Sequence, residues 1–203
     1  MNVLDLAYAD DLAIMSESTT ELEEFIQDFE TITQKCGLTM NVKKTLIMSV
    51  KQLQQDATGR IIKGQMVNQP DFNMKIRNEK DKHTESFIYL GCCITADQTM
   101  EKKIGIRISK ASAPFYMLKY CVWHRKTVSY DAKLRIFRAC VLPILLYGSE
   151  VWALTNIQER RLNSFYMKCL RTIIGANLED RLSNAKMLEL TGQPQIRCYL
   201  EKE

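Results

Sequence analysis

The sequence predicts an α+β fold, in which a small region of mostly antiparallel strands with one packed helix is followed by a helical region. Two short apolar stretches flank a turn at residues 3–7 and 12–15, and residues 18–37 form a capped amphipathic segment. From Thr99 onward, apolar residues recur at helical spacing. We therefore divide the chain into residues 1–98, residues 99–176 and a C-terminal extension, residues 177–203.

The first predicted element is a β-hairpin. Its two apolar stretches are separated by Tyr-Ala-Asp-Asp, residues 8–11. Aspartate is tolerated in tight turns because its side chain bonds to nearby backbone groups. Two short strands joined by this turn are the expected structure.

A helix and further strands are predicted next. Ser18 is a credible N-cap with Glu21 three residues later, and Gly37 supplies the stop. The alternation in residues 38–50 indicates a strand against the opening hairpin, for a sheet of three to five strands in all. Residues 51–85 are polar and predict loops around one or two weak strands, whereas residues 87–95 are a β-rich run broken by Gly91.

Three helices are predicted in the second half. The first begins near Thr99, and Pro114 should end or kink it. The second runs from about Asp131 to Trp152 and should bend at Pro143. The third, residues 157–174, places its apolar residues on one face and ends at Gly175.

Charge is distributed unevenly along the chain. Residues 1–35 hold one Lys and nine Asp or Glu, a net charge of −8, whereas residues 99–171 hold fourteen Lys or Arg and four Asp or Glu, a net charge of +10. A basic region of this size suits a phosphate backbone, although a charge run is usually only a solvated face. The sequence therefore favours nucleic acid as a partner of the helical half.

Composition excludes several classes of protein. With 46% hydrophobic and 26% charged residues, the chain is typical of globular domains rather than disordered ones. No apolar run reaches the roughly 18 residues of a membrane span, and the N-terminus lacks a secretory signal, so a cytoplasmic or nuclear and not secreted protein is expected. The seven cysteines show no CxxC spacing, which predicts buried reduced thiols.

The paired aspartates suit metal-assisted phosphoryl transfer. Two divalent cations about 4 Å apart need carboxylates on a rigid element, and Mg²⁺ prefers oxygen ligands. Successive strand residues point to opposite faces, so only a turn lets Asp10 and Asp11 approach one site. The alternative is that the pair merely stabilises the turn.

Three ordered motifs resemble reverse transcriptases of non-long-terminal-repeat, LINE-like retrotransposons. Residues 8–11, YADD, resemble the active-site hairpin. Residues 37–45, GLTMNVKKT, are similar to the next motif, and residues 87–91, FIYLG, resemble the following hairpin that grips the primer. Residues 133–152 and 162–175 are similar to the thumb of these enzymes. The resemblance implies a partial polymerase palm and a helical thumb of an RNA-directed DNA polymerase, a nucleotidyltransferase with an RNA template and a DNA primer.

The resemblance also implies roles for individual residues. Asp10 and Asp11 match the pair that binds Mg²⁺ or Mn²⁺ in the complete enzyme, and Lys44 matches a lysine that neutralises or protonates the leaving pyrophosphate. Tyr8 and Ala9 should lie near the primer terminus. Candidates for contact with the primer or other nucleic acid are Tyr89, Leu90, Gly91, Lys102, Lys103, Arg107 and Lys110. Each has a plain alternative: a strand-edge lysine, a buried strand with a bulge glycine, or a solvated surface cation.

The sequence predicts different positions for the two tryptophans. Trp123 precedes His124, Arg125 and Lys126, a mixture of stacking and charge that suits nucleic acid and equally suits a helix end. Trp152 lies in an apolar face, which favours a place in the core.

One departure from the family pattern limits the expected activity. The family needs a further metal-binding Asp on a strand upstream of the hairpin, and Asp5 lies on the same strand as the turn. We therefore expect the chain alone to be inactive, and an unpaired sheet edge to be exposed. The alternatives are a non-catalytic nucleic-acid-binding module, a decayed retroelement remnant, or an unrelated helical protein with a chance Tyr-Ala-Asp-Asp.

Overall fold

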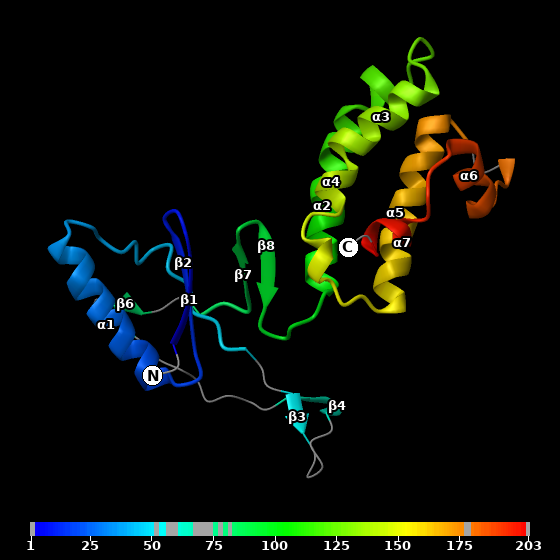
Figure 1. The fold of residues 1–203 in the computed structure, drawn as a ribbon. Helices are drawn as coiled ribbons and strands as arrows, with labels where there is room; N and C mark the ends of the chain where they lie inside the picture. Colours follow the sequence, from blue (N-terminus) through cyan, green and yellow to red (C-terminus); the bar gives the residue numbers. More distant parts are fainter. Residues whose placement is uncertain are drawn as a thin grey trace. The chain divides into compact units, whose positions relative to one another are not determined.

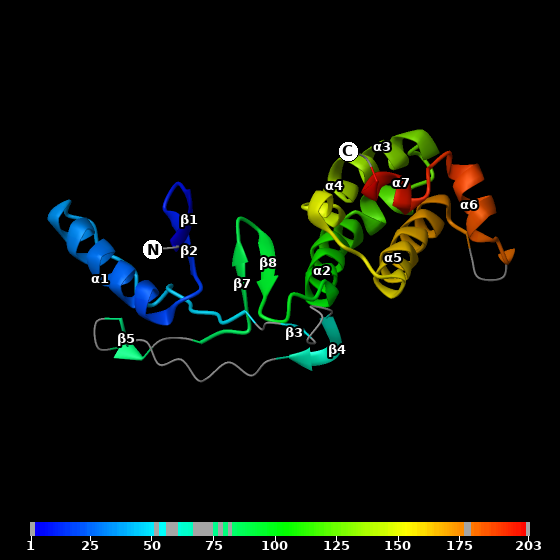
Figure 2. The same ribbon diagram turned by 60° about the horizontal axis from the view of Figure 1, so that its bottom comes forward.

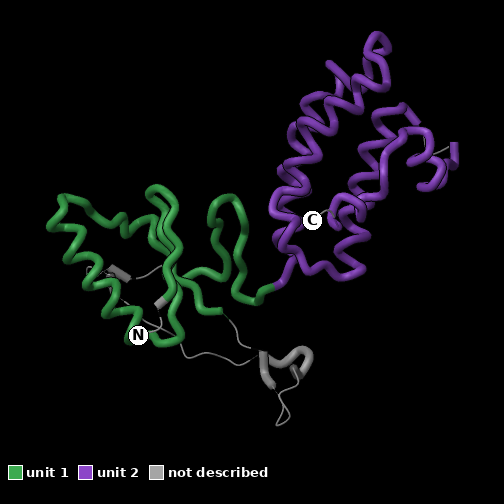
Figure 3. Tube along the Cα trace, in the orientation of Figure 1, with its two compact units in different colours: residues 1–98 green, residues 99–203 purple. Residues whose placement is uncertain are grey.

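The computed structural model describes residues 3–50, 53–55, 61–66, 75–76, 79–80, 83–176 and 180–201. The chain divides into two compact units, residues 1–98 and residues 99–203 (Figure 3). The first unit holds the strands and one helix, and the second is helical (Figures 1 and 2). The chain is therefore a mixed α+β protein, as the sequence predicted.

The opening hairpin has the predicted structure. Strands β1 (Val3–Tyr8) and β2 (Asp11–Ser16) pair antiparallel, with Tyr8 opposite Asp11. Only Ala9 and Asp10 remain in the loop. A two-residue loop fixes the register of the strands, and this register places Leu4, Leu6 and Tyr8 on one face of the hairpin.

Helix α1 (Thr19–Lys35) begins and ends where the sequence indicates. The Ser18 hydroxyl accepts a hydrogen bond from the Glu21 amide at 3.4 Å, and Gly37 adopts a φ of +73° just past the helix. Leu22 and Ile26 of the helix pack against Ile47. This cluster is the small core of the first unit.

The strand predicted over residues 38–50 is wrong. This segment is irregular, and only Ile47 forms an isolated parallel bridge, with His83. The backbone turns instead at Asn41, whose carbonyl accepts from the Lys44 amide at 3.0 Å and whose side-chain oxygen accepts from the same amide at 3.3 Å. Asparagine offers the backbone such local bonds, and they compete with a strand ladder.

Six further strands form three short hairpins. Their bounds are β3 (Leu53–Gln55) with β4 (Ile61–Met66), β5 (Lys75–Ile76) with β6 (Glu79–Lys80), and β7 (Ser86–Tyr89) with β8 (Cys92–Thr95). Every sheet within the described ranges therefore has two strands. The single sheet of three to five strands expected from the sequence is not formed by these residues.

The turn of the β7–β8 hairpin corrects the role of its glycine. Tyr89 pairs with Cys92, so Leu90 and Gly91 form the loop, with φ values of +47° and +76°. Two positive φ values match a type I′ turn, which twists with the strands and favours glycine. Gly91 thus breaks the run by making a turn between two strands, and it is not the bulge glycine that the sequence offered as an alternative.

The first helix of the second unit continues through its proline. Helix α2 (Glu101–Met117) contains Pro114 and is followed by the π-helix η1 (Lys119–Trp123). A proline in a helix removes one backbone donor, but Ala111 and Phe115 on either side are buried in the core and hold the segment helical. The expectation that Pro114 ends the helix is therefore wrong.

The second predicted helix is three separate elements. They are α3 (Tyr130–Cys140), α4 (Leu142–Leu145) and the 3₁₀ helix η2 (Ser149–Val151). Pro143 lies in the first turn of α4, where its missing N–H costs nothing, so it starts a new helix rather than bending the old one. Gly148, with a φ of +76°, lies between α4 and η2.

Helix α5 (Asn156–Ile174) confirms the third predicted helix. Thr155 and Gln158 form a reciprocal capping box at its start, and Gly175 adopts a left-handed conformation at its end. The short helices α6 (Asn184–Thr191) and α7 (Ile196–Leu200) both contact α5. All three lie in the same compact unit.

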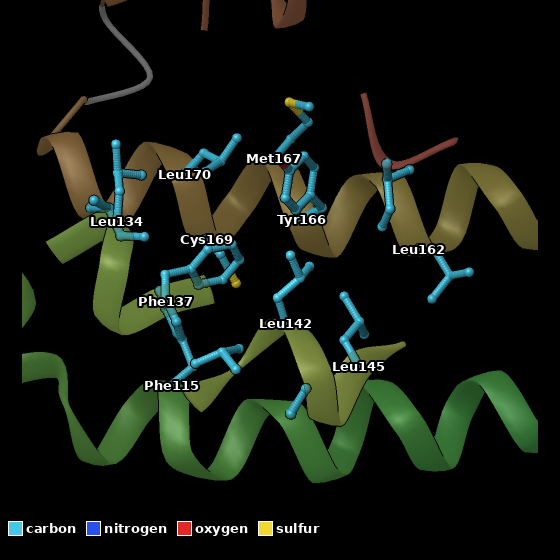
Figure 4. Close-up of a cluster of buried hydrophobic side chains, with 14 of the residues drawn as sticks. Phe115, Leu134, Phe137, Leu142, Leu145, Leu162, Tyr166, Met167, Cys169 and Leu170 are labelled. Carbon is cyan, nitrogen blue, oxygen red and sulfur yellow. The ribbon is translucent and has the colours of Figure 1, made fainter. Parts of the chain in front are cut away.

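The core of the second unit lies between α2, α3, α4 and α5. Figure 4 shows Leu162, Tyr166 and Cys169 of α5 facing side chains from the other helices. Fully or nearly fully buried aromatic rings form its centre: Phe115, Trp123, Phe137 and Tyr166. Burial of this much apolar surface makes the second unit the better packed of the two.

Both tryptophans pack in or against the core of the second unit. Trp123 is 2% exposed, stacks on Phe115 with ring centroids 5.2 Å apart, and donates from Nε1 to the Phe115 carbonyl at 2.7 Å. It is therefore a core residue and not a surface for nucleic-acid bases. Trp152 is partly buried and packs against the same core, as predicted.

The cysteines are free but mostly not buried. No disulfide forms, and Cys93 and Cys169 are the only two of the seven that are buried. Burial raises the pKa of the Cys169 thiol to about 12. The predicted burial is wrong for Cys140, which lies in the last turn of α3 on its exposed side.

Within the described ranges, the structure contains no helix with the length and apolar character that crossing a membrane requires.

Candidate functional site

The acidic pair lies at the tip of the opening hairpin. Asp10 is the second loop residue and Asp11 begins β2. Both side chains are exposed, and neither forms an ion pair with the described residues. Because a tight loop replaces the strand geometry at Asp10, the two carboxylates need not point to opposite faces. They are available to a ligand at one end of the hairpin.

Ala9 adopts an unusual backbone conformation beside this pair. Its φ is +53°, at the first of two loop positions, where glycine is the usual residue. A left-handed conformation costs a residue with a Cβ about 1–2 kcal/mol. Strain of this kind occurs often at functional sites, and Ala9 shares it with Leu90, Gln98 and Arg181.

The acidic pair is not part of a larger cluster. The described residues contain no group of three or more His, Cys, Asp or Glu side chains that could hold a metal ion. Two carboxylates supply hard oxygen ligands of the type that Mg²⁺ and Mn²⁺ accept, but such ions need about six ligands. The two carboxylates could supply some of the ligands of a metal site but not a complete set.

Lys44 lies in the turn that begins at Asn41. Its side chain is exposed, and its ammonium forms no ion pair with Asp10 or Asp11. Its backbone amide donates to Asn41. The structure therefore brings Lys44 to the surface of the first unit without joining it to the acidic pair.

A side-chain hydrogen bond joins the two hairpins that carry the remaining candidates. The Tyr89 hydroxyl donates to the carbonyl oxygen of Leu6 at 2.9 Å. Leu6 lies two residues before Tyr8, which is 65% exposed. The loop residues Leu90 and Gly91 follow directly after this anchor. Sequence analysis singled out Tyr89 but gave no sign of this contact, which spans 83 residues.

The basic candidates in α2 fall into two groups. Lys102 and Lys110 are exposed and Lys103 is half-buried. Arg107 is only 7% exposed, and its guanidinium lies 4.3 Å from the centroid of the Tyr147 ring. Arg107 thus packs against the segment after α4 and presents little surface to a phosphate.

Exposed aromatic residues near these cations were not singled out by the sequence analysis. Tyr116 at the end of α2 is 47% exposed, and Tyr120 in η1 is 75% exposed. Their spacing with His124, four residues apart each time, is the signal in the sequence that could have found them.

Comparisons with known proteins show what the first unit is similar to. Residues 2–94 match the model of the reverse transcriptase (RNA-dependent DNA polymerase) family. The match contains both the Asp10–Asp11 turn and the Tyr89 hairpin. No solved structure matches the chain.

Individual relatives are distant and mostly longer. The chain is 23% identical over 181 residues to the RNA-directed DNA polymerase from the mobile element jockey of Drosophila funebris, covering 86% of this chain and 18% of that protein. It is 20% identical to the jockey polymerase of Drosophila melanogaster over 86% of this chain and 18% of that protein. It is 25% identical to a transposon-derived protein of Caenorhabditis elegans, over 89% of this chain and 60% of that protein.

The chain thus spans less than a fifth of the length of the jockey polymerases that it matches. The similarity nevertheless extends over most of both of its units. Residues 2–94 therefore match the reverse transcriptase (RNA-dependent DNA polymerase) family, and the chain is distantly similar to the jockey polymerases.

Proposed function

We propose that the first unit supplies part of the active site of an RNA-directed DNA polymerase. The observation that carries this proposal is the hairpin turn with Asp10 in its loop and Asp11 at the start of β2, both exposed and without ion-pair partners among the described residues. The family match over residues 2–94 and the strain at Ala9 support it. The reaction is transfer of a nucleotide to a primer 3′-hydroxyl, with an RNA template and release of pyrophosphate.

Asp10 and Asp11 would hold Mg²⁺ or Mn²⁺. When bound, two such ions stabilise the attacking and leaving oxygens of the phosphoryl group. The remaining work falls to residues of the chain: Tyr8 and Ala9 line the position of the primer end, and Lys44 donates a proton or positive charge to the leaving pyrophosphate. The type I′ turn at Leu90 and Gly91 contacts the primer strand, and the Tyr89 hydrogen bond to Leu6 fixes its position relative to Asp10.

Weak metal binding is expected for the acidic pair alone. Two exposed carboxylates compete poorly with the water around a divalent cation, and a complete centre needs further oxygen ligands. A polypeptide of these 203 residues is therefore proposed to bind Mn²⁺ at the turn without polymerising nucleotides by itself.

Paramagnetic line broadening tests the metal site. Addition of Mn²⁺ should broaden the amide NMR signals of residues 8–12 before other signals, and Asp10→Asn and Asp11→Asn should each reduce this effect. Asp28→Asn is a matched control, because Asp28 is an exposed aspartate on α1 away from the turn. Equal broadening around Asp28 and Asp10 would mean that the turn has no special affinity, and the proposal would fail.

A second candidate function is nucleic-acid binding by the helical unit. The net charge of +10 over residues 99–171 and the exposed ammonium groups of Lys102 and Lys110 favour it. This function does not need the acidic turn. It predicts that binding to a primer-template survives Asp10→Asn and weakens steeply as salt increases.

A further inference from the structure

An aromatic surface emerges where α2 passes into η1. Tyr116, Tyr120 and His124 follow one another at intervals of four residues, which places neighbouring rings on one side of a helix. The Tyr120 and His124 rings meet edge to face, with centroids 5.7 Å apart. Tyr120 is 75% exposed and buries little of its area in this fold, whereas Tyr116, at 47%, keeps about half of its area exposed. Their rings are therefore open to a flat partner.

Each of the two tyrosine rings has a lysine ammonium beside it. Lys168 Nζ lies 5.7 Å from the centroid of Tyr116, and Lys119 Nζ lies 5.4 Å from the centroid of Tyr120. A hydrogen bond with the Tyr116 side chain is the main cause that raises the pKa of Lys168. Lys168 therefore carries charge at neutral pH. Three helical elements, α2, η1 and α5, contribute to this aromatic-basic surface, which consists of Tyr116, Lys119, Tyr120, His124 and Lys168.

Acidic residues are absent from the parts of the sequence that form this surface. Residues 102–130 contain seven Lys or Arg and no Asp or Glu, and residues 160–178 contain four Lys or Arg and no Asp or Glu. The two acids just before these stretches are already paired, Glu101 with Arg161 and Glu159 with Arg197. An anionic ligand would meet little repulsion here.

A comparison within the same unit separates this surface from ordinary packing. Lys133 Nζ also lies over a tyrosine, 5.5 Å from the centroid of Tyr130. That lysine is 6% exposed and donates to the Trp123 carbonyl at 2.8 Å, so it is buried and forms a hydrogen bond within the unit. Lys168, in contrast, is exposed together with its ring. The Tyr116–Lys168 pair joins α2 to α5 at the surface and not in the core.

We propose that the aromatic-basic surface binds single-stranded nucleic acid, with bases stacked on Tyr116 and Tyr120 and phosphates at Lys119 and Lys168. Bases stack on aromatic side chains only when they are not stacked within a duplex, which selects single strands. The surface is indifferent to sequence, because every base has a flat face. This inference deepens the second candidate function and gives it a ligand class, whereas it is independent of the acidic turn.

Fluorescence anisotropy with the 203-residue chain tests the proposal. The probes are labelled 15-nucleotide strands of deoxythymidine and of uridine, and a labelled duplex of the same length, all in EDTA to exclude metal-dependent binding. Loss of one stacked base should weaken binding about 5- to 100-fold, so Tyr116→Ala and Tyr120→Ala should each show a change of this order. Both single strands should bind more tightly than the duplex.

Two kinds of control make the result specific. Tyr116→Phe and Tyr120→Phe keep the ring and should retain wild-type affinity, whereas Tyr130→Ala removes another exposed tyrosine and should change little. Lys168→Gln should lower the slope of log K against log salt by about 0.7. Thermal unfolding of each variant verifies that the fold is intact.

Several results would overturn the proposal. Phe variants as weak as the Ala variants, Ala variants that bind like the wild type, or a duplex that binds as tightly as the single strands would each exclude stacking. Binding confined to one of the two strands would exclude it as well, since stacking requires neither the 2′-hydroxyl nor the thymine methyl group. Asp10→Asn should leave the affinity unchanged, so failure of the polymerase proposal and failure of this one are observed separately.

Discussion

Replacement of Trp123 by phenylalanine distinguishes a core residue from a nucleic-acid contact. The ring stacks on Phe115 and its Nε1 donates to the Phe115 carbonyl at 2.7 Å. Phenylalanine retains an apolar ring but cannot donate, so a buried carbonyl loses this partner at a cost of about 1–3 kcal/mol. The smaller ring adds a cavity contribution. We expect the free energy of unfolding to fall by about 2–4 kcal/mol in total.

The corresponding thermal shift is large enough to measure. For a unit of this size, each kcal/mol lowers Tm by roughly 4 °C, so Tm should fall by about 8–16 °C. Urea denaturation followed by fluorescence gives the same quantity, since Trp152 remains as a reporter. Tyr120→Phe is the surface control and should leave Tm within about 1 °C.

An unchanged Tm together with a reduced affinity would contradict a core position for Trp123. If Trp123→Phe kept the wild-type Tm while affinity for single-stranded nucleic acid fell, the indole would be a surface contact and not a core residue. Retained affinity at low temperature, where the variant is still folded, is the expected result.

Three further predictions concern the turn and the buried thiol. Ala9→Gly removes the strain of a φ of +53°, partly offset by the entropy of glycine, and should slow amide exchange of residues 7–12 about 2- to 5-fold, as measured by hydrogen-exchange NMR. Primer extension of oligo(dT) on poly(A) with Mg²⁺ should give no product with the 203-residue chain, and product that is lost in Asp10→Asn would contradict this. The folded state keeps the Cys169 proton up to a pKa of about 12, against 9.0 for an unperturbed thiol, so the unfolded chain releases its proton first. The free energy of unfolding should therefore fall as pH rises from 9 to 12, and urea titrations of Cys169→Ala should show a smaller fall.

Local signals in the sequence predicted the elements whose ends are fixed by nearby residues. Ser18 and Gly37 bound α1, and Thr155 and Gly175 bound α5, because caps are short-range hydrogen bonds and backbone conformations. The Asp10 turn was predictable for the same reason. Elements of this kind do not depend on distant parts of the chain.

Patterns of apolar residues without caps or turn residues at their ends led to wrong predictions. Alternating apolar residues in 38–50 indicated a strand, but the hydrogen bonds of Asn41 to residues 44 and 45 form a turn instead. Pro143 was read as a bend, although the chain uses it to begin a new helix. In both cases the same residues favour two different local structures, a strand or a turn and a bent helix or a new helix. Hydropathy alone does not decide between them.

Contacts between residues that are far apart along the chain could not be predicted from the sequence. Arg107 reads as a surface cation, and its burial depends on a tyrosine forty residues later. Trp123 next to three polar residues reads as a binding motif, and its burial depends on how η1 turns back onto Phe115. Spacing along one helix is visible in the sequence, whereas the partner that covers it is not.

The hydrogen bond from Tyr89 to Leu6 has a consequence for alignment. It joins two hairpins that share no backbone ladder in the described part of the chain. A strand of nucleic acid resting on Leu90 and Gly91 would be held at a fixed offset from the carboxylates at the tip of β1 and β2. Replacement of Tyr89 by phenylalanine would remove this hydrogen bond between the two hairpins and leave Asp10 and Asp11 unchanged.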